Sequence, residues 1–167
     1  AFVGQHSMAN VRGGIMAHSF SSLGIQNMLL NGKPVGEIGI WTAMAGWFDT
    51  PVILLTGDGA AAEELRAMVA EAETAVVKEG LGRYTCLSMS APAARDLIRE
   101  RAAAAMRKIG IRPYKVRGPV TIQIEYTTRN SLPPDAGLAP GAEVLDDRTI
   151  RYHGKDFLEA WTRYRVR

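Results

Sequence analysis

The sequence has little cysteine and no long hydrophobic run. Its single cysteine, Cys86, cannot form an internal disulfide, which excludes a disulfide-stabilised secreted scaffold and fits a reducing, cytoplasmic compartment. No stretch approaches the ~18 consecutive apolar residues that a membrane-spanning helix needs, and the start shows no basic segment followed by an apolar one that would indicate a signal peptide. We therefore expect a cytoplasmic chain with no membrane partner.

A large surplus of one charge sign is also lacking. The chain carries 20 Lys and Arg against 17 Asp and Glu, a formal net charge of +3, and the two signs are interleaved over most of its length. Only the arginines at positions 163, 165 and 167 form a local surplus. A solvated terminal tail accounts for these better than a phosphate-binding strip. No nucleic-acid partner is expected.

What is present is the composition of a folded domain. The chain has 167 residues, 47% of them hydrophobic and 22% charged, which suits one ordinary domain with its own core. Strand patterns occur at residues 1–4, 25–30, 51–56, 75–78, 84–89, 119–127, 142–144 and 148–152, and helical patterns at 36–48, 60–72, 91–109 and 156–164. This alternation predicts an α/β or mixed α+β domain, with a mixed sheet flanked by helices, as a single unit over residues 1–167.

Several local features follow from the same patterns. Residues 1–4 are predicted to end a buried strand. Cys86 lies in an apolar-alternating strand and is expected to be a small buried hydrophobe rather than a nucleophile. The adjacent acids Glu63 and Glu64 are predicted to lie on the exposed face of a helix that Asp58 caps.

Glycine, proline and alanine mark the other boundaries. Residues 79–82, with two glycines, are expected to form a turn, and residues 130–141, with three prolines and two glycines, a loop. The clearest helix is 91–109, which has Pro92 in its first turn and a stripe of apolar side chains directed towards the core.

The residues best suited to chemistry are His6, His18 and Glu37. They are the only metal-type ligands that are close in sequence and lie in loop-rich surroundings, since residues 7–24 are rich in glycine, serine and asparagine. Imidazole and carboxylate suit Zn²⁺, which in a catalytic site keeps a position for water and lowers its pKa to about 7. The gaps of eleven and eighteen residues are not the helical His-Glu-x-x-His spacing. From the residues alone, a metal site and histidines that merely hydrogen-bond within loops both stay open.

Three other motifs favour structural roles. The turn of Gly57, Asp58 and Gly59 lacks the further glycine and the Lys-Ser/Thr pair of a phosphate-binding loop, so a helix cap is expected. Ser19 follows a histidine directly, but no Gly-x-Ser-x-Gly elbow surrounds it. His153 is expected to take a loop or cap role.

Four segments of the first third resemble the zinc-dependent D-aminopeptidase family, the self-compartmentalising peptidases of the bacterial dipeptide-uptake type. They are residues 3–9 (VGQHSMA), 14–19 (GIMAHS), 31–39 (NGKPVGEIG) and 45–58 (AGWFDTPVILLTGD). Their order and approximate spacing match the family, and a looser similarity continues as far as the closing helix. The resemblance therefore covers nearly the whole chain.

The resemblance implies roles for three residues. His6 and Glu37, the latter in a Gly-Glu-x-Gly motif, resemble zinc ligands, and His18 resembles the catalytic histidine of the family. The family uses two zinc ions, and its remaining ligands, an Asp-x-Glu pair near the start of the protein and a further histidine, have no counterpart here. We therefore expect the carboxy-terminal part of a larger two-domain α/β enzyme, with residues 1–50 carrying the site and 51–167 serving as scaffold and assembly part.

The activity that the resemblance implies is hydrolysis of short peptides with an amino-terminal D-residue, by zinc-activated water. A second zinc ion would be completed by residues outside this chain. The expected partners are the peptide substrate, further copies in a large homo-oligomer, and an amino-terminal piece of the same protein. Two alternatives stay open: a related metal-dependent amidohydrolase of other specificity, and a non-catalytic assembly module that lacks the upstream ligands.

Overall fold

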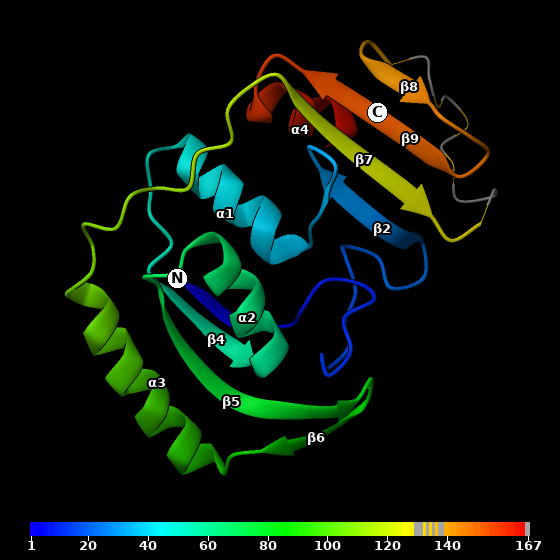
Figure 1. Cartoon of the computed structure of the whole chain (residues 1–167). Helices are drawn as coiled ribbons and strands as arrows, with labels where there is room; N and C mark the ends of the chain where they lie inside the picture. The colour runs from blue at the N-terminus through cyan, green and yellow to red at the C-terminus, as the bar shows by residue number, and fades with distance from the viewer. Residues whose placement is uncertain (129–131, 133, 135, 137–138, 166–167) are drawn as a thin grey trace.

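The computed structural model describes residues 1–128, 132, 134, 136 and 139–165. These residues form two β-sheets with four α-helices packed against and between them (Figure 1). This is the mixed α/β architecture, with sheets flanked by helices, that the sequence predicted. Half of the loop expected at 130–141 lies outside the described residues.

The first sheet has the strand order β1-β4-β5-β6. Its strands are β1 (Phe2–Gln5), β4 (Leu54–Asp58), β5 (Glu73–Gly82) and β6 (Thr85–Ser88), of which the first three are mutually parallel and β6 is antiparallel to β5. Every residue of the central strand β4 is buried, as expected of a parallel strand covered on both faces. The prediction that residues 1–4 are buried was wrong, since β1 is an edge strand of this sheet and Val3 is 71% exposed.

The β5–β6 hairpin corrects two further predictions. The turn expected at 79–82 is instead the last part of β5, and the chain reverses at Arg83 and Tyr84. Figure 1 shows this hairpin extending past the start of α3 (Ala91–Met106), and Arg83, Tyr84 and Thr85 at its tip are exposed. Cys86 is therefore only half-buried rather than part of the core.

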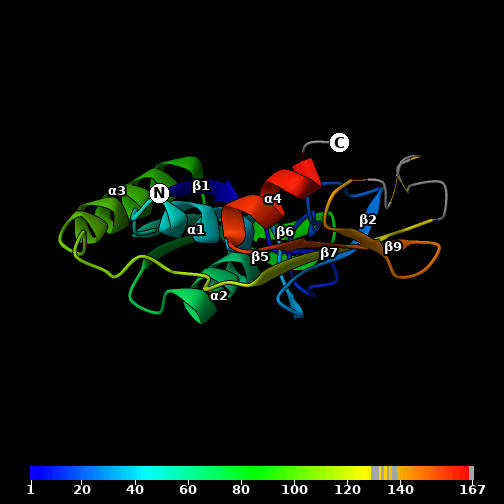
Figure 2. The same ribbon diagram turned by 90° about the horizontal axis from the view of Figure 1, so that it is seen from above.

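Helices α2 (Gly59–Met68) and α3 pack on β4 and β5 and lie on opposite sides of that sheet (Figure 2). Helix α3 ends at Met106 rather than at residue 109, and its expected inward stripe is mostly half-buried or exposed, with only Ala105 fully buried among its described residues. An alanine-rich sequence favours a helix regardless of how much of it is buried, so the pattern predicted the helix but not its exposure.

The second sheet is antiparallel, with the strand order β3-β2-β7-β9-β8. Its strands are β2 (Ile25–Leu30), β3 (Lys33–Pro34), β7 (Val120–Tyr126), β8 (Ala142–Val144) and β9 (Thr149–Gly154), and α4 (Phe157–Arg165) packs on β7 and β9. Strand β7 alternates strictly between buried and half-buried residues, which confirms the predicted half-exposed strand. Arg163 and Arg165 belong to α4 rather than to a tail, while Arg167 lies outside the described residues.

Helix α1 (Glu37–Trp47) joins the two halves of the molecule. Its Ile38 packs in the core of the first sheet, whereas Ile40 and Ala43 pack in the core of the second. Trp41 and Trp47 of this helix stay partly exposed, but burying each isoleucine stabilises the fold by about 1.5–3 kcal/mol. The two cores together therefore fix the position of the first residue of this helix, Glu37.

None of the helices in the described part of the chain combines the length and the apolar character required to cross a lipid bilayer.

Candidate metal centre

His6 lies at the carboxyl edge of the first sheet. It directly follows β1, and Gln5 at the end of β1 is in register with Gly57 near the end of the parallel strand β4. In open α/β sheets, ligands bind outside the carboxyl ends of the strands. The topology therefore places His6 where this kind of sheet forms its sites.

His18 is held in the long connection between β1 and β2, which contains no helix or strand. Its neighbours Met16 and Phe20 have φ angles of 52° and 58°, in the left-handed region that side chains rarely adopt. The connection is fixed from outside, because the Met16 amide donates to the carbonyl of Arg83 at 2.8 Å and the Ile15 amide donates to Oδ2 of Asp58 at 2.9 Å. Such strain persists only where the surrounding structure determines the backbone, and it is common at functional sites.

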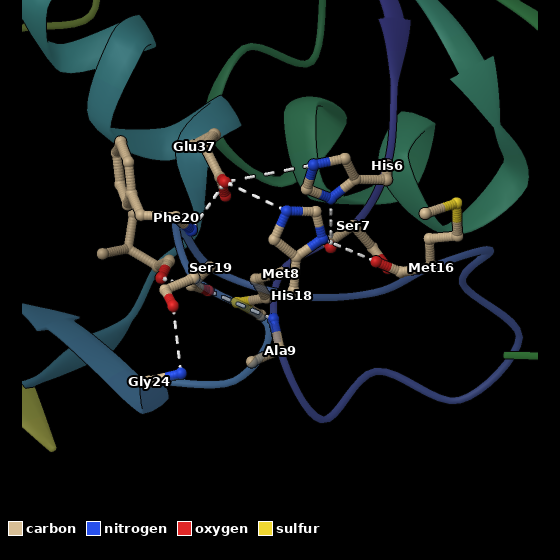
Figure 3. Close-up of polar contacts among 12 residues, drawn as sticks. His6, Ser7, Met8, Ala9, Met16, His18, Ser19, Phe20, Gly24 and Glu37 are labelled. Atoms are coloured by element: carbon tan, nitrogen blue, oxygen red, sulfur yellow. Dashed lines mark hydrogen bonds and ion pairs between the residues drawn. The ribbon is translucent and has the colours of Figure 1, made fainter. Parts of the chain in front are cut away.

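The structure brings His6, His18 and Glu37 together (Figure 3). Oε1 of Glu37 is 4.0 Å from Nε2 of His6 and 3.7 Å from Nε2 of His18. One ligand atom from each residue lies within 4.8 Å of the other two, and no other group of three such residues occurs in the part of the chain that the structure describes. The three residues that the sequence analysis singled out thus form one cluster.

Backbone carbonyls fix the tautomers of both rings. Nδ1 of His6 lies 3.0 Å from the carbonyl oxygen of Ser7, and Nδ1 of His18 lies 2.7 Å from that of Met16. Because a carbonyl oxygen only accepts, each Nδ1 must carry the proton and donate it. Each Nε2 then faces Glu37 (Figure 3), and histidines bind metals through one ring nitrogen while the other donates to a carbonyl.

Glu37 is oriented by one oxygen and free to bind through the other. Oε1 accepts the amide hydrogen of Phe20 at 2.6 Å. Oε2 is buried and has no hydrogen-bond partner among the described residues, although a buried carboxylate oxygen without a partner is costly. As the first residue of α1, Glu37 also lies at the positive end of the helix dipole, which favours its negative charge.

This donor set fits a zinc ion. Two neutral nitrogens and a carboxylate are ligands that zinc accepts at ~2.0–2.2 Å, and the orphaned Oε2 of Glu37 would gain a partner. Ligand atoms sharing a tetrahedral zinc ion lie about 3.3 Å apart, so the separations of 4.0 and 3.7 Å between Oε1 of Glu37 and the two Nε2 atoms would have to shorten by roughly 0.4–0.7 Å. The exposed fractions are 25% for each histidine side chain and 14% for Glu37, so the cluster is partly in contact with solvent.

The motifs that were expected to be structural do not join this cluster. Asp58 caps α2 by accepting the Ala61 amide hydrogen at 2.8 Å, as the sequence predicted. Ser19 is buried and accepts the amide hydrogen of Ala9. His153 lies within β9 rather than in a loop or cap, and its Nε2 is 2.9 Å from Oε2 of Glu143.

The sequence analysis missed Glu64. It was expected on an exposed helix face with Glu63, but its side chain turns inward and accepts the amide hydrogen of Met8 at 2.8 Å. Burial raises the pKa of Glu64, and the charge of Glu37 acts in the same direction, while nearby backbone amides oppose both. A pair of adjacent acids gives no signal of this kind, because the partner is a main-chain amide 56 residues away.

Fold and site together define a class: an α/β protein with a cluster of two histidines and a carboxylate, suited to a metal, at the carboxyl edge of a parallel sheet. The chain belongs to the D-aminopeptidase family of peptidases, family M55, whose profile matches residues 1–166. The resemblance recognised in the sequence is thereby confirmed.

Two relatives are similar over almost the whole chain. A D-aminopeptidase of Bacillus subtilis is 32% identical over 162 residues, which is 96% of this chain. The solved structure of the zinc-dependent D-aminopeptidase DppA from Bacillus subtilis, described as a self-compartmentalizing protease, superimposes with a TM-score of 0.87 at 29% identity and 98% coverage of this chain. The chain spans 58% of the length of the first and 59% of the second, so it corresponds to a part of each.

Proposed function

We propose that this chain carries part of the centre of a zinc-dependent aminopeptidase that hydrolyses short peptides with an amino-terminal D-residue. Two lines of support meet here. The family and the printed names of the relatives give the reaction class and the metal. The carrying observation is that one ligand atom each of His6, His18 and Glu37 lies within 4.8 Å of the other two.

In this proposal His6 and Glu37 bind the zinc ion. His6 offers the lone pair of Nε2, since its Nδ1 proton is donated to the carbonyl of Ser7. Glu37 offers a buried oxygen with no other partner among the described residues. When bound, zinc supplies Lewis acidity, which polarises a carbonyl and lowers the pKa of water.

His18 is proposed as the catalytic histidine. Its Nδ1 proton is held by the carbonyl of Met16, so this ring can gain or release a proton only at Nε2, the atom that faces Glu37. A histidine can act as acid or base, or can donate a hydrogen bond to a tetrahedral intermediate.

The remaining proposals concern what lies outside this chain. We propose that a second zinc ion is completed by residues that this chain does not supply, and that residues 51–167 serve as scaffold and assembly part. The name of the DppA structure supports assembly into a closed homo-oligomer. The cytoplasm is the proposed compartment, which would keep Cys86 reduced.

Zinc binding is the first test. The purified chain is titrated with zinc in competition with a chromophoric chelator, beside the variants Glu37→Gln and Glu63→Gln. Both substitutions remove one carboxylate charge, but only Glu37 belongs to the cluster. We expect Glu37→Gln to weaken binding at least about tenfold and Glu63→Gln to leave it unchanged. Equal affinities in the two variants would contradict the assignment of the site.

Hydrolysis is the second test. The zinc-loaded chain is assayed on D-Ala-D-Ala and on L-Ala-L-Ala, alone and together with any amino-terminal piece that co-purifies with it. Cleavage restricted to the D-dipeptide supports the proposal. Cleavage of other amides only would instead favour an amidohydrolase of other specificity, and zinc binding without turnover in either preparation would favour an assembly module.

A further inference from the structure

Glu64 differs sharply from Glu63, the acid beside it in α2. Glu63 is exposed, whereas Glu64 is directed inward between two segments that carry the metal-type ligands. Its Oε2 accepts the amide hydrogen of Met8 at 2.8 Å. Met8 is two residues after His6, so this bond ties the segment that follows β1 to helix α2.

The other oxygen of Glu64 lies against the start of α1. A Cβ added to Gly36, the residue before Glu37, would lie 3.2 Å from Oε1 of Glu64 and 2.6 Å from Cβ of Met8. The carboxylate, Met8 and the backbone before Glu37 are thus in mutual contact. Any side chain at position 36 would force them apart, so glycine is needed there.

The N-cap residue of α1, Gly36, provides no side-chain hydrogen bond, although the first amides of a helix need acceptors. Burial raises the pKa of Glu64, and the amides of Met8, Gly36 and Gly39 only partly oppose this by favouring the ionised form. Its Oε1 nevertheless makes no regular hydrogen bond among the described residues, so its interaction with these amides is electrostatic.

We propose that Glu64 is a positioning residue for the metal centre: it holds Met8, and with it His6, against the beginning of α1, where Glu37 stands. The inference rests on the proposed function only in assigning zinc to the cluster. Glu64 itself does not bind the ion. It fixes the distance between two ligands that arrive from different parts of the chain, as carboxylates around metal sites commonly do.

The first measurement is zinc affinity. The chain and its variants Glu64→Gln, Glu64→Ala and Glu63→Gln are titrated with zinc well below their melting temperatures. We expect Glu64→Ala to weaken binding about 10- to 100-fold, Glu64→Gln to weaken it less because its amide oxygen can still accept from Met8, and Glu63→Gln to have no effect. The proposal would be overturned if both Glu64 variants bound zinc as tightly as Glu63→Gln does.

The second measurement needs no metal. Hydrogen exchange at the Met8 amide is followed by NMR in the metal-free chain, with amides of β7 and β9 reporting whether the second sheet is intact. We expect Glu64→Ala to speed exchange at Met8 about tenfold or more while β7 and β9 keep their protection. Unchanged protection of Met8 would overturn the proposal even if the native chain bound zinc.

The two measurements separate the possible failures. A native chain that binds no zinc would defeat the proposed function, and the exchange experiment alone would then decide whether Glu64 holds Met8. If Glu64→Ala does not fold, Glu64→Gln decides both measurements. In that case, the proposal would be overturned if Glu64→Gln matched Glu63→Gln both in zinc affinity and in the protection of the Met8 amide.

Discussion

The imidazole rings of His6 and His18 are stacked, with centroids 4.0 Å apart and ring planes inclined by 18°. Both rings direct Nε2 towards the same oxygen of Glu37. This geometry allows His18 either to bind an ion together with His6 or to stand beside the bound ion and exchange a proton. The two roles have different consequences when the ring is removed.

We expect His18→Ala to abolish most of the turnover while the bound zinc is retained, because His6 and Glu37 are the proposed ligands. Losing a general acid or base typically lowers the rate about 10²- to 10⁴-fold. Zinc content and the rate of D-Ala-D-Ala hydrolysis are measured on the same sample. The control is His153→Ala, which removes a histidine of β9 that pairs with Glu143 and should change neither quantity. If His18→Ala lost zinc in proportion to its loss of activity, His18 would instead be a zinc ligand.

The connection that carries His18 is in direct backbone contact with the β5–β6 hairpin. A Cβ on Gly80 would lie 2.0 Å from the carbonyl oxygen of Gly13, a contact that only a backbone shift could relieve. We expect Gly80→Ala to lower the free energy of unfolding by about 1–3 kcal/mol, as overpacking does, and to weaken zinc binding through the displaced connection. Urea unfolding and zinc titration measure the two effects.

Gly82→Ala is the control for this prediction. It makes the same change two residues further along β5, where an added Cβ meets nothing within 4 Å. We expect its stability and zinc affinity to match those of the unsubstituted chain. If both variants behave alike, the contact between Gly13 and Gly80 has no influence on the site.

These glycines also show why part of the fold could not be predicted from sequence. Gly80 and Gly82 indicate a turn when only the neighbouring residues are considered, but Gly80 lies inside β5 because the connection before His18 approaches it. The requirement comes from a segment about 70 residues away. By contrast, β4, β7 and α1 were predictable, because each has its own pattern of apolar residues.

The candidate site shows the same division. His6, His18 and Glu37 were found because their residue types and flanking motifs match a family, whereas their spacing in sequence gave no geometry. Glu64 was missed since its role depends on a main-chain amide, and an amide is present at almost every position. Residues that bind a metal through their side chains can be recognised in a sequence by their type. A residue that holds a main-chain amide in place, such as Glu64, cannot be recognised in this way.

Asp58 is predicted to contribute to stability in two ways. Its Oδ1 accepts the Ala61 amide hydrogen and caps α2, and its Oδ2 accepts that of Ile15 in the connection before His18. We expect Asp58→Ala to lower the free energy of unfolding by about 2–4 kcal/mol, roughly 1 for the cap and the remainder for the second, partly buried bond. Urea unfolding provides the measurement.

Asp156→Ala is the matched control, because among the described residues the Asp156 side chain accepts one hydrogen bond, from the Glu159 amide at the start of α4. It should cost about 1 kcal/mol and leave zinc affinity unchanged. If Asp58→Ala is no more destabilising than Asp156→Ala, the bond between Asp58 and Ile15 contributes nothing to the fold.

The last prediction concerns acid. Hydrogen bonds from Lys108 and Arg101 lower the pKa of Glu73 below its ordinary value of 4.5, against the opposing effect of burial. A carboxyl whose pKa is lowered by folding adds stability above its unfolded pKa, and this stability is lost as the pH falls through the folded value. Glu73→Gln should therefore reduce stability near neutral pH, by at most about 1 kcal/mol because both cations are partly exposed. The difference in stability should vanish well below pH 4.5, where the Glu73 carboxyl is protonated in both the folded and the unfolded chain.

Urea unfolding at about pH 7 and about pH 3 measures this difference in stability. The control is Glu79→Gln, which changes an exposed acid of the same strand. A stability difference that persists unchanged in acid would mean that Glu73 acts through packing rather than through its charge.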